Sequence, residues 1–247
     1  MELSGLVRYV ADKGLSAVDL SALDESLRAE LLARVGERYV DTGRLSDAVK
    51  AYEMAGNIEG LVMVGDICVQ RGSLSDAMRA YEMSGRELPR EQLVQVGDIC
   101  LERGWLSDAT RAYEMAGNAG GLVKIGDEYM ERGWLLEAMQ AYGMARNTDG
   151  LAKVGDICIE MGSLPGAMRA YKTVGRELTS DELVRVGHAC LKMGLLSDAM
   201  RGYQMAGYTE GLIRLGDTFM EHGQLSDAIK AYEMAGRVDL ANFLRQF

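Results

Sequence analysis

The sequence is poor in the residues that build strands. It has three phenylalanines among 247 residues, and threonine and isoleucine are also scarce. Strands favour β-branched and aromatic side chains, so this composition argues against a strand-rich fold. Leu, Ala, Met and Gly are abundant instead, and 48% of the residues are hydrophobic. The composition indicates a soluble helical protein.

Long apolar segments and an excess of positive charge are also missing. The chain has no apolar run of about eighteen residues, so we expect no membrane span. Its start, MELSGLVRYVADKG, lacks the basic and apolar segments of a signal peptide. The net charge of −10 argues against nucleic-acid binding, which requires a basic face. We predict a cytoplasmic protein with neither a membrane nor a nucleic acid as partner.

Histidine and cysteine are too few and too dispersed to form a recognisable catalytic or metal site. His188 and His222 stand more than one repeat apart and have no nucleophile nearby in the sequence. Metal ligands and disulfide partners usually show close or paired spacing, and this chain has no CxxC pair. We therefore predict no catalysis, no cofactor and no metal, and apolar thiols buried in a reducing compartment. The four cysteines occupy the same column of an internal repeat: Cys68, Cys100, Cys158 and Cys190.

Glycines at regular spacing reveal that repeat. Seven glycines are separated by 29, 32, 29, 29, 32 and 29 residues, so the pattern recurs as a block of 90 residues. They are Gly36, Gly65, Gly97, Gly126, Gly155, Gly187 and Gly216. The spacing predicts seven units over residues 32–236, which begin near Leu32, Leu61, Leu93, Leu122, Leu151, Leu183 and Leu212.

Each unit has helical periodicity in two segments joined by a glycine turn. In the fourth unit, Leu122, Ile125, Gly126 and Tyr129 follow the i, i+3, i+4, i+7 pattern of a helix face. Glycines suited to left-handed helix ends follow the second segments at Gly56, Gly85, Gly117, Gly175, Gly207 and Gly236. Ser73 and Ser163 suit the N-cap position of their second helices.

Two units, the third and the sixth, carry three extra residues before their first helix. The extra residues lie in LPREQ (88–92) and LTSDE (178–182). Pro89 suits a first helical position, and Thr179 with Glu182 matches a capping box. We therefore expect these two first helices to begin about one turn earlier than the others.

The two ends of the chain depart from the pattern, as the terminal repeats of such arrays commonly do. Residues 1–31 read as a degenerate repeat or cap, with a helix over 4–13 that stops at Gly14, and with Ser21 or Asp24 to cap the next helix. Residues 237–247 read as a C-terminal amphipathic capping helix. Its apolar positions are Leu240, Phe243, Leu244 and Phe247.

The repeat resembles the tetratricopeptide repeat (TPR), whose unit has Leu-Gly-x-x-Tyr, a glycine turn, and then Ala-x-x-x-Phe/Tyr. Here Gly126, Tyr129, Gly133, Ala138 and Tyr142 match in order and spacing. The units are shorter than the usual 34 residues, and the early tryptophan and closing proline are absent. The resemblance implies an all-α fold, a right-handed α-solenoid of seven antiparallel helix-turn-helix repeats with helical end caps. The matching columns are Ala48, Ala77, Ala109, Ala138, Ala167, Ala199 and Ala228, and Tyr52, Tyr81, Tyr113, Tyr142, Tyr171, Tyr203 and Tyr232.

The resemblance also implies that the first helices line a concave groove that binds peptides or partner helices. The residue after each first-helix glycine would face this groove: Glu37, Asp66, Asp98, Asp127, Asp156, His188 and Asp217. Three residues before each stand Arg34, Met63, Gln95, Lys124, Lys153, Arg185 and Arg214. These residues either read charges on a partner or form exposed helix pairs worth about 0.2–0.5 kcal/mol each. Asp replaces the Asn of the family's carboxylate clamp, which argues against recognition of an acidic chaperone tail.

Tryptophan and methionine give two further interpretations. Trp105 and Trp134 follow the glycine turn in adjacent units and either form an exposed aromatic contact or cover the ends of their own helices. Helical spacing of the methionines favours mainly core positions, whereas exposure of the second column would favour self-association. The columns are Met78, Met139, Met168 and Met200, and Met54, Met83, Met115, Met144, Met205 and Met234.

The leading hypothesis is a non-catalytic scaffold that binds an unidentified protein or peptide in the groove of its first helices. One alternative is a structural solenoid that associates with itself into an oligomer. A further alternative is a regulatory subunit of an enzyme complex.

Overall fold

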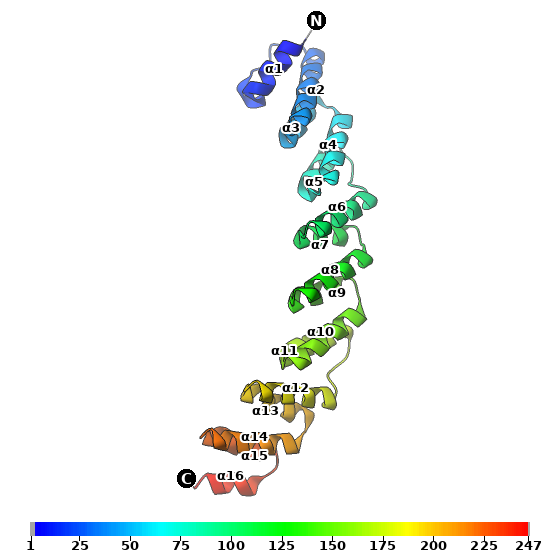
Figure 1. The fold of residues 1–247 in the computed structure, drawn as a ribbon. Coiled ribbons are helices and arrows are strands. Elements are labelled where there is room, and N and C mark those ends of the chain that lie inside the picture. Colours follow the sequence, from blue (N-terminus) through cyan, green and yellow to red (C-terminus); the bar gives the residue numbers. More distant parts are fainter. Residues whose placement is uncertain (1–2, 247) are drawn as a thin grey trace. The chain divides into compact units, whose positions relative to one another are not determined.

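A computed structural model describes residues 3–246, which form sixteen α-helices, one short 3-10 helix and no strand (Figure 1). The predicted all-α helical repeat fold is confirmed. The chain divides into two compact units, one ending at Ile125 and the other beginning at Gly126. The division falls within α8 (Ala119–Glu131).

The first unit opens with α1 (Ser4–Lys13) and a 3-10 turn (Leu15–Ala17), and then forms helix pairs. The pairs are α2 (Glu25–Asp41) with α3 (Leu45–Ala55), α4 (Ile58–Gln70) with α5 (Leu74–Met83), and α6 (Arg90–Glu102) with α7 (Leu106–Met115). Within this unit the first helices α2, α4 and α6 also pack side by side.

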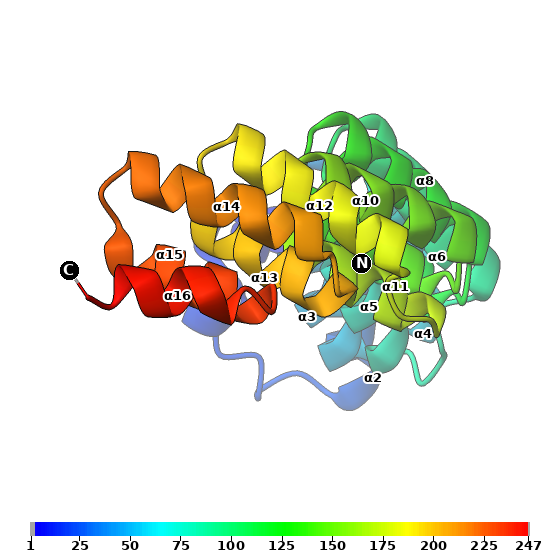
Figure 2. The same ribbon diagram turned by 90° about the horizontal axis from the view of Figure 1, so that it is seen from below.

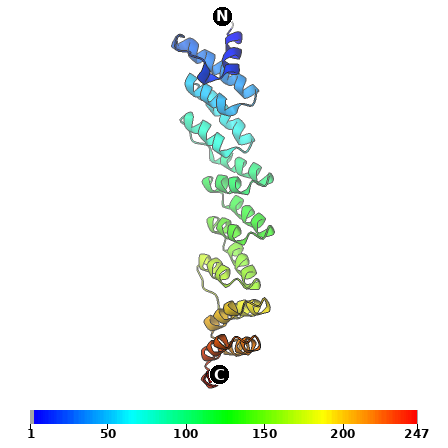
Figure 3. The same ribbon diagram turned by 90° about the vertical axis from the view of Figure 1, so that its left-hand side faces the viewer.

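The second unit begins in α8 and continues with α9 (Leu135–Met144). Its later pairs are α10 (Thr148–Glu160) with α11 (Leu164–Val174), α12 (Ser180–Lys192) with α13 (Leu196–Ala206), and α14 (Thr209–Glu221) with α15 (Leu225–Met234). The first helices α10, α12 and α14 pack side by side (Figure 3). The last helix, α16 (Val238–Leu244), lies along α15 (Figure 2).

Local capping explains where the helices begin and end. The Asp24 and Asn57 side chains accept hydrogen bonds from Leu27 N and Gly60 N at the starts of α2 and α4. Ser73 and Ser163 occupy N-cap positions but make no capping bond. As predicted, the glycines after the second helices adopt positive φ, for example +63° at Gly56 and +89° at Gly175. In the fourth repeat this position is Arg146, at φ +53°, the one non-glycine residue with positive φ among residues 3–246.

The extra residues of the third and sixth repeats do not lengthen a helix, so the prediction of an added turn is wrong. The helices α6 and α12 have 13 residues each, the same length as α4. Pro89 lies at the N-cap rather than inside α6, and Thr179 forms the predicted capping box with Glu182. Residues 86–89 and 176–179 instead form extended connections.

The length of a connection decides how neighbouring repeats meet. At three of the short connections the second helix packs against the next first helix: α3 against α4, α9 against α10, and α13 against α14. The pairs α5–α6 and α11–α12 lack this packing, because the longer connection lies between the two helices.

The chain ends confirm part of the predicted apolar pattern. Val7 and Val10 of α1 are buried, and α1 stops at Gly14, whose φ is +93°. In α16, Ala241 and Leu244 are buried, whereas Phe243 is 56% exposed. The predicted contribution of Phe247 lies outside the described residues. The division into cap, seven repeats and capping helix at residues 31 and 237 stays a prediction.

Candidate functional site

The tyrosine column forms the centre of each repeat, because its ring occupies a slot that only glycine leaves open. A Cβ atom added to Gly126 would lie 2.5 Å from the Tyr142 ring, and one added to Gly150, in the following first helix, also 2.5 Å. Such distances are far below van der Waals contact. Each tyrosine ring is therefore held between a glycine of its own repeat and, at the short connections, a glycine of the next. The same double slot holds Tyr52 (Gly36, Gly60), Tyr113 (Gly97, Gly121) and Tyr203 (Gly187, Gly211).

The acidic residues predicted to face a partner hold the hydroxyl groups of these tyrosines. Tyr142 Oη donates to Asp127 Oδ1 at 2.6 Å, and Tyr171 Oη donates to Asp156 Oδ1 at 2.8 Å. Burial, reinforced by the neighbouring Asp156 carboxylate, raises the pKa of Tyr171 to about 12. The same bond joins Tyr81 to Asp66, Tyr113 to Asp98, and Tyr232 to Asp217.

Two repeats depart from this arrangement. In the sixth, Tyr203 Oη lies 2.8 Å from His188 Nδ1, and the His188 ring also packs edge-on against Tyr208. In the first, the Tyr52 hydroxyl is buried without a hydrogen-bond partner, although Glu37 stands fifteen residues before it. The longer glutamate side chain does not form the bond that aspartate forms elsewhere.

The structure places every predicted groove residue on a first helix with its side chain exposed or half-buried. Because α2, α4 and α6 pack side by side in the first unit, and α10, α12 and α14 in the second, their residues form a continuous surface in each unit, which we call the first-helix row. In the second unit, Arg185 and His188 also line a cleft of about 400 Å³ on α10 and α12. The row comprises Arg34, Glu37, Asp66 and Asp98 in the first unit, and Lys153, Asp156, Arg185, His188, Arg214 and Asp217 in the second, while Lys124 and Asp127 lie on α8.

The basic residues of the row do not form the i, i+3 ion pairs considered from the sequence. Arg34 and Arg214 pair with acids four residues earlier, Glu30 and Glu210. Within the described residues, Lys153 and Arg185 make no ion pair. Their charges therefore remain available to a partner.

The tryptophans lie at the starts of second helices. Trp105 is the N-cap residue of α7 and is 47% exposed, and Trp134 has the same position in α9 and is 49% exposed. The guanidinium carbon of Arg103 lies 5.0 Å from the Trp105 ring centroid, and that of Arg132 lies 5.5 Å from the Trp134 centroid. Each indole thus covers its own helix turn while leaving about half of its surface exposed.

The prediction that both methionine columns belong mainly to the core is wrong for the second column. Met54 in the second column is 56% exposed, whereas the first column is mixed, with Met139 7% and Met168 37% exposed. The second column falls on the outer edge of the second helices, beyond the stripe that the alanines bury. Its other exposed members are Met115, Met144, Met205 and Met234, at 42–44%.

The cysteines are buried thiols, as predicted. Cys100 Sγ donates to Gly72 O at 3.2 Å, and Cys190 Sγ donates to Gly162 O at 3.0 Å, each across a repeat boundary. Burial raises the pKa of Cys68 to about 11, which disfavours the reactive thiolate. In residues 3–246 no group of three or more His, Cys, Asp or Glu side chains is arranged to hold a metal ion.

The two long connections create equivalent clefts, one in each unit. The α5–α6 cleft, of about 620 Å³, has an apolar floor of Met78, Leu88, Leu93 and Met115. The α11–α12 cleft, of about 700 Å³, has the corresponding floor of Met168, Leu178, Leu183 and Met205, each 90 residues further along the chain. Sequence reasoning missed these clefts because it assigned the extra residues to helix.

Comparison with known proteins leaves the family open. No family model matches the sequence, and no curated protein matches it. Among solved structures, the chain is similar to a circular tandem repeat protein with novel repeat topology and enhanced subunit contact surfaces, with 14% identity and a TM-score of 0.18. The alignment covers 98% of this chain and 58% of that one, so the chain spans little more than half the length of that protein. The assignment as a helical repeat protein rests on the repeated helix pairs themselves.

None of the helices within the described residues is both long and apolar enough to cross a bilayer.

Proposed function

We propose that this chain is a TPR-like, non-catalytic scaffold that binds a protein or peptide along its first-helix row. The observation that supports the proposal is the continuous exposure of charged side chains on adjacent first helices. Lys153 and Asp156 on α10 lie beside Arg185 and His188 on α12, and these beside Arg214 and Asp217 on α14.

The aspartates of this row favour binding because they are already oriented. A carboxylate whose Oδ1 accepts from a buried tyrosine has lost rotational freedom before any partner arrives, so binding costs less side-chain entropy. Asp156 and Asp217 are both held in this way. The unpaired Lys153 and Arg185 supply the complementary charge, and the pattern of alternating sign favours a partner of matching pattern.

The test reverses the unpaired cations rather than the aspartates, because changing Asp156 would also remove the hydrogen bond of Tyr171. Lysates passed over immobilised wild-type protein and over a Lys153→Glu, Arg185→Glu variant are compared by mass spectrometry, and the affinity for each captured partner is measured. We expect about tenfold weaker binding or more, equal to about 1.4 kcal/mol. Arg201→Glu, an exposed charge reversal on the second helix α13, serves as control. Equal binding by a folded row variant would refute the proposal.

Self-association is a second candidate, favoured by the exposure of the second methionine column. Met144, Met205 and Met234 present polarizable, flexible side chains on second helices of one unit. Analytical ultracentrifugation across a concentration series separates the two functions. A monomer at all concentrations rules out the oligomer, and a Met205→Lys, Met234→Lys variant should remain monomeric where the wild type associates.

A further inference from the structure

The two clefts at the long connections have the same apolar floor but different charges at the rim. In the α5–α6 cleft, Glu82 and Glu87 are balanced by Arg86 and Arg90, and Arg90 already donates to Gly117 O. In the α11–α12 cleft the residue equivalent to Glu82 is Lys172. The second cleft has Ser180 where the first has Arg90, but its rim of Arg169, Lys172, Arg176 and Glu177 is still the more cationic of the two.

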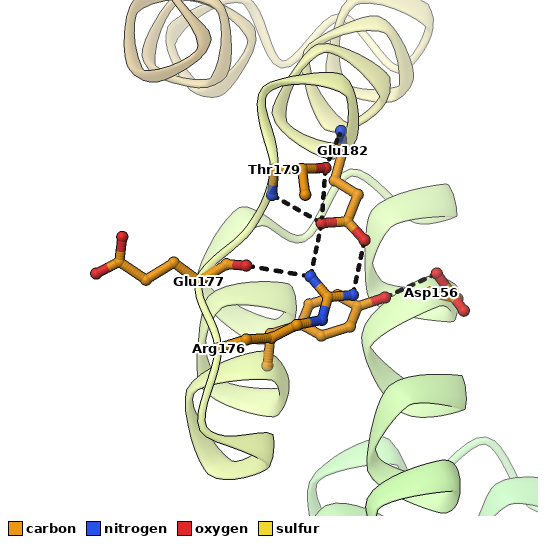
Figure 4. Close-up of polar contacts among 6 residues, drawn as sticks. Asp156, Arg176, Glu177, Thr179 and Glu182 are labelled. Atoms are coloured by element: carbon orange, nitrogen blue, oxygen red, sulfur yellow. Dashed lines mark hydrogen bonds and ion pairs between the residues drawn. The ribbon is translucent and has the colours of Figure 1, made fainter.

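The cations at the α11–α12 cleft differ in availability. Arg176 is engaged, since its Nη1 and Nη2 donate to the Glu182 carboxylate at 2.9 and 2.8 Å and its guanidinium lies 3.8 Å from the Tyr171 ring centroid (Figure 4). Arg169 and Lys172 lie one turn apart on α11, are exposed, and make no ion pair within the described residues. The acid of this rim, Glu177, directs its carboxylate away from the Arg176–Glu182 pair (Figure 4).

Arg176 fixes the shape of the cleft. It ties the connection to the first turn of α12, because the same Glu182 carboxylate also accepts from Thr179 N at 2.8 Å. The connection that carries Leu178 is thereby held in place beside α11 before any ligand binds. Such preorganisation lowers the entropic cost of binding.

We propose that the α11–α12 cleft binds an acidic peptide segment that inserts a bulky aliphatic or aromatic side chain. The side chain fills the floor formed by Met168, Leu178 and Met205, and the flanking carboxylates pair with Arg169 and Lys172. The volume of about 700 Å³ lies within the roughly 300–1,000 Å³ typical of ligand sites. The net charge of the chain is −10, so the rest of its surface repels an acidic peptide. The cationic rim therefore directs such a peptide to this cleft.

This site goes beyond the first-helix row, with which it shares no residue. The α5–α6 cleft, with Glu82 in place of Lys172, discriminates against the same peptide. At this position the two clefts carry opposite charges.

The experiment pans a phage-displayed random peptide library against the full chain and measures the enriched peptides by fluorescence anisotropy. We expect enriched peptides that carry Asp or Glu beside Leu, Met or an aromatic residue. Lys172→Glu, which reproduces the other cleft, and Leu178→Asp, which lies on the connection rather than in a helix, should each weaken binding about tenfold or more. Glu82→Lys should add a second site for the same peptide.

The matched control is Lys153→Glu, the same charge change in the first-helix row. It should leave peptide binding unchanged, so failure of the cleft and failure of the row are distinguished. Circular dichroism establishes that each variant is folded. The proposal is overturned if no peptide is enriched, if the enriched peptides lack acidic residues, or if folded Lys172→Glu and Leu178→Asp variants bind them as the wild type does.

Discussion

The ion pair between Arg176 and Glu182 gives a quantitative prediction about stability. The hydrogen bonds from Arg176, followed by those from Thr179, lower the pKa of Glu182 from 4.5 to about 2. A shift of this size corresponds to about 3 kcal/mol of stability. Because the Arg176 side chain is 42% exposed, solvent screening should reduce this contribution to about 1–2 kcal/mol. Glu182→Gln, which installs the residue found at the equivalent position 92, should lose that amount at neutral pH.

The pH dependence separates the ion pair from other effects. Since the pKa of Glu182 is lowered on folding, its contribution is complete above pH 4.5 and disappears as the pH falls toward 2. Urea unfolding at several pH values should therefore show the wild-type and Glu182→Gln curves converging in acid. Hydrogen exchange of the α12 amides should locate the loss, because repeat arrays unfold in parts.

The control is Asp181→Asn, which removes an equal charge from the same first turn of α12 but makes no ion pair within the part of the chain that the structure describes. This variant should lower the free energy of unfolding only by the contribution of the helix dipole, about 0.3–1 kcal/mol. The stabilising role of the Arg176–Glu182 ion pair would be refuted by either of two results. One is an equal loss of unfolding free energy in the two variants, and the other is a loss in Glu182→Gln that persists unchanged at pH 2.

Two further predictions concern the tyrosine slots. A Cβ at Gly121 would lie 2.4 Å from the Tyr113 ring, close to the root of that side chain, so Gly121→Ala should destabilise the first unit by about 1–3 kcal/mol in urea unfolding. The neighbouring Gly120→Ala meets nothing closer than 3.5 Å and should be neutral or stabilising by about 0.5 kcal/mol, so equal behaviour of the pair would contradict the slot. Glu37→Asp should give the buried Tyr52 hydroxyl its missing acceptor and raise the melting temperature through about 1 kcal/mol of added stability; an unchanged or lower value would count against this.

The sequence was sufficient to predict the helices, their turns and most of the buried columns. Gly126 and Tyr142 recur in register in every repeat, and such repetition indicates packing whatever the surroundings. The hydrogen bond of Asp127 to Tyr142 was missed, because helical periodicity shows which way a residue points but not what it meets fifteen residues later. The constant separation of the two columns was the signal that could have revealed it.

The conformation of the extra residues could not be predicted from local rules. Pro89 and the Thr179–Glu182 capping box fit a helix start equally well with or without an added turn. The choice depends on how the neighbouring repeats pack, because Gln92 and Glu182 stand where the short connections have a glycine against the tyrosine ring. Likewise, the exposure of Met54 depends on how much of its side chain the neighbouring repeat covers. The residue spacing within one repeat does not show this.

At the short connections, the slot that a tyrosine shares with the following repeat has a consequence for recombination of such arrays. Tyr52 needs Gly60 and Tyr142 needs Gly150, whereas the long connections place Gln92 or Glu182 at that point. The interchangeable module is therefore the junction from one second helix to the next first helix, not the repeat as counted from its first leucine. Chimeras cut inside a helix pair, at turns such as Gly43 or Gly133, keep every junction intact. Chimeras cut between pairs combine a tyrosine with the wrong neighbour whenever a short and a long junction are exchanged.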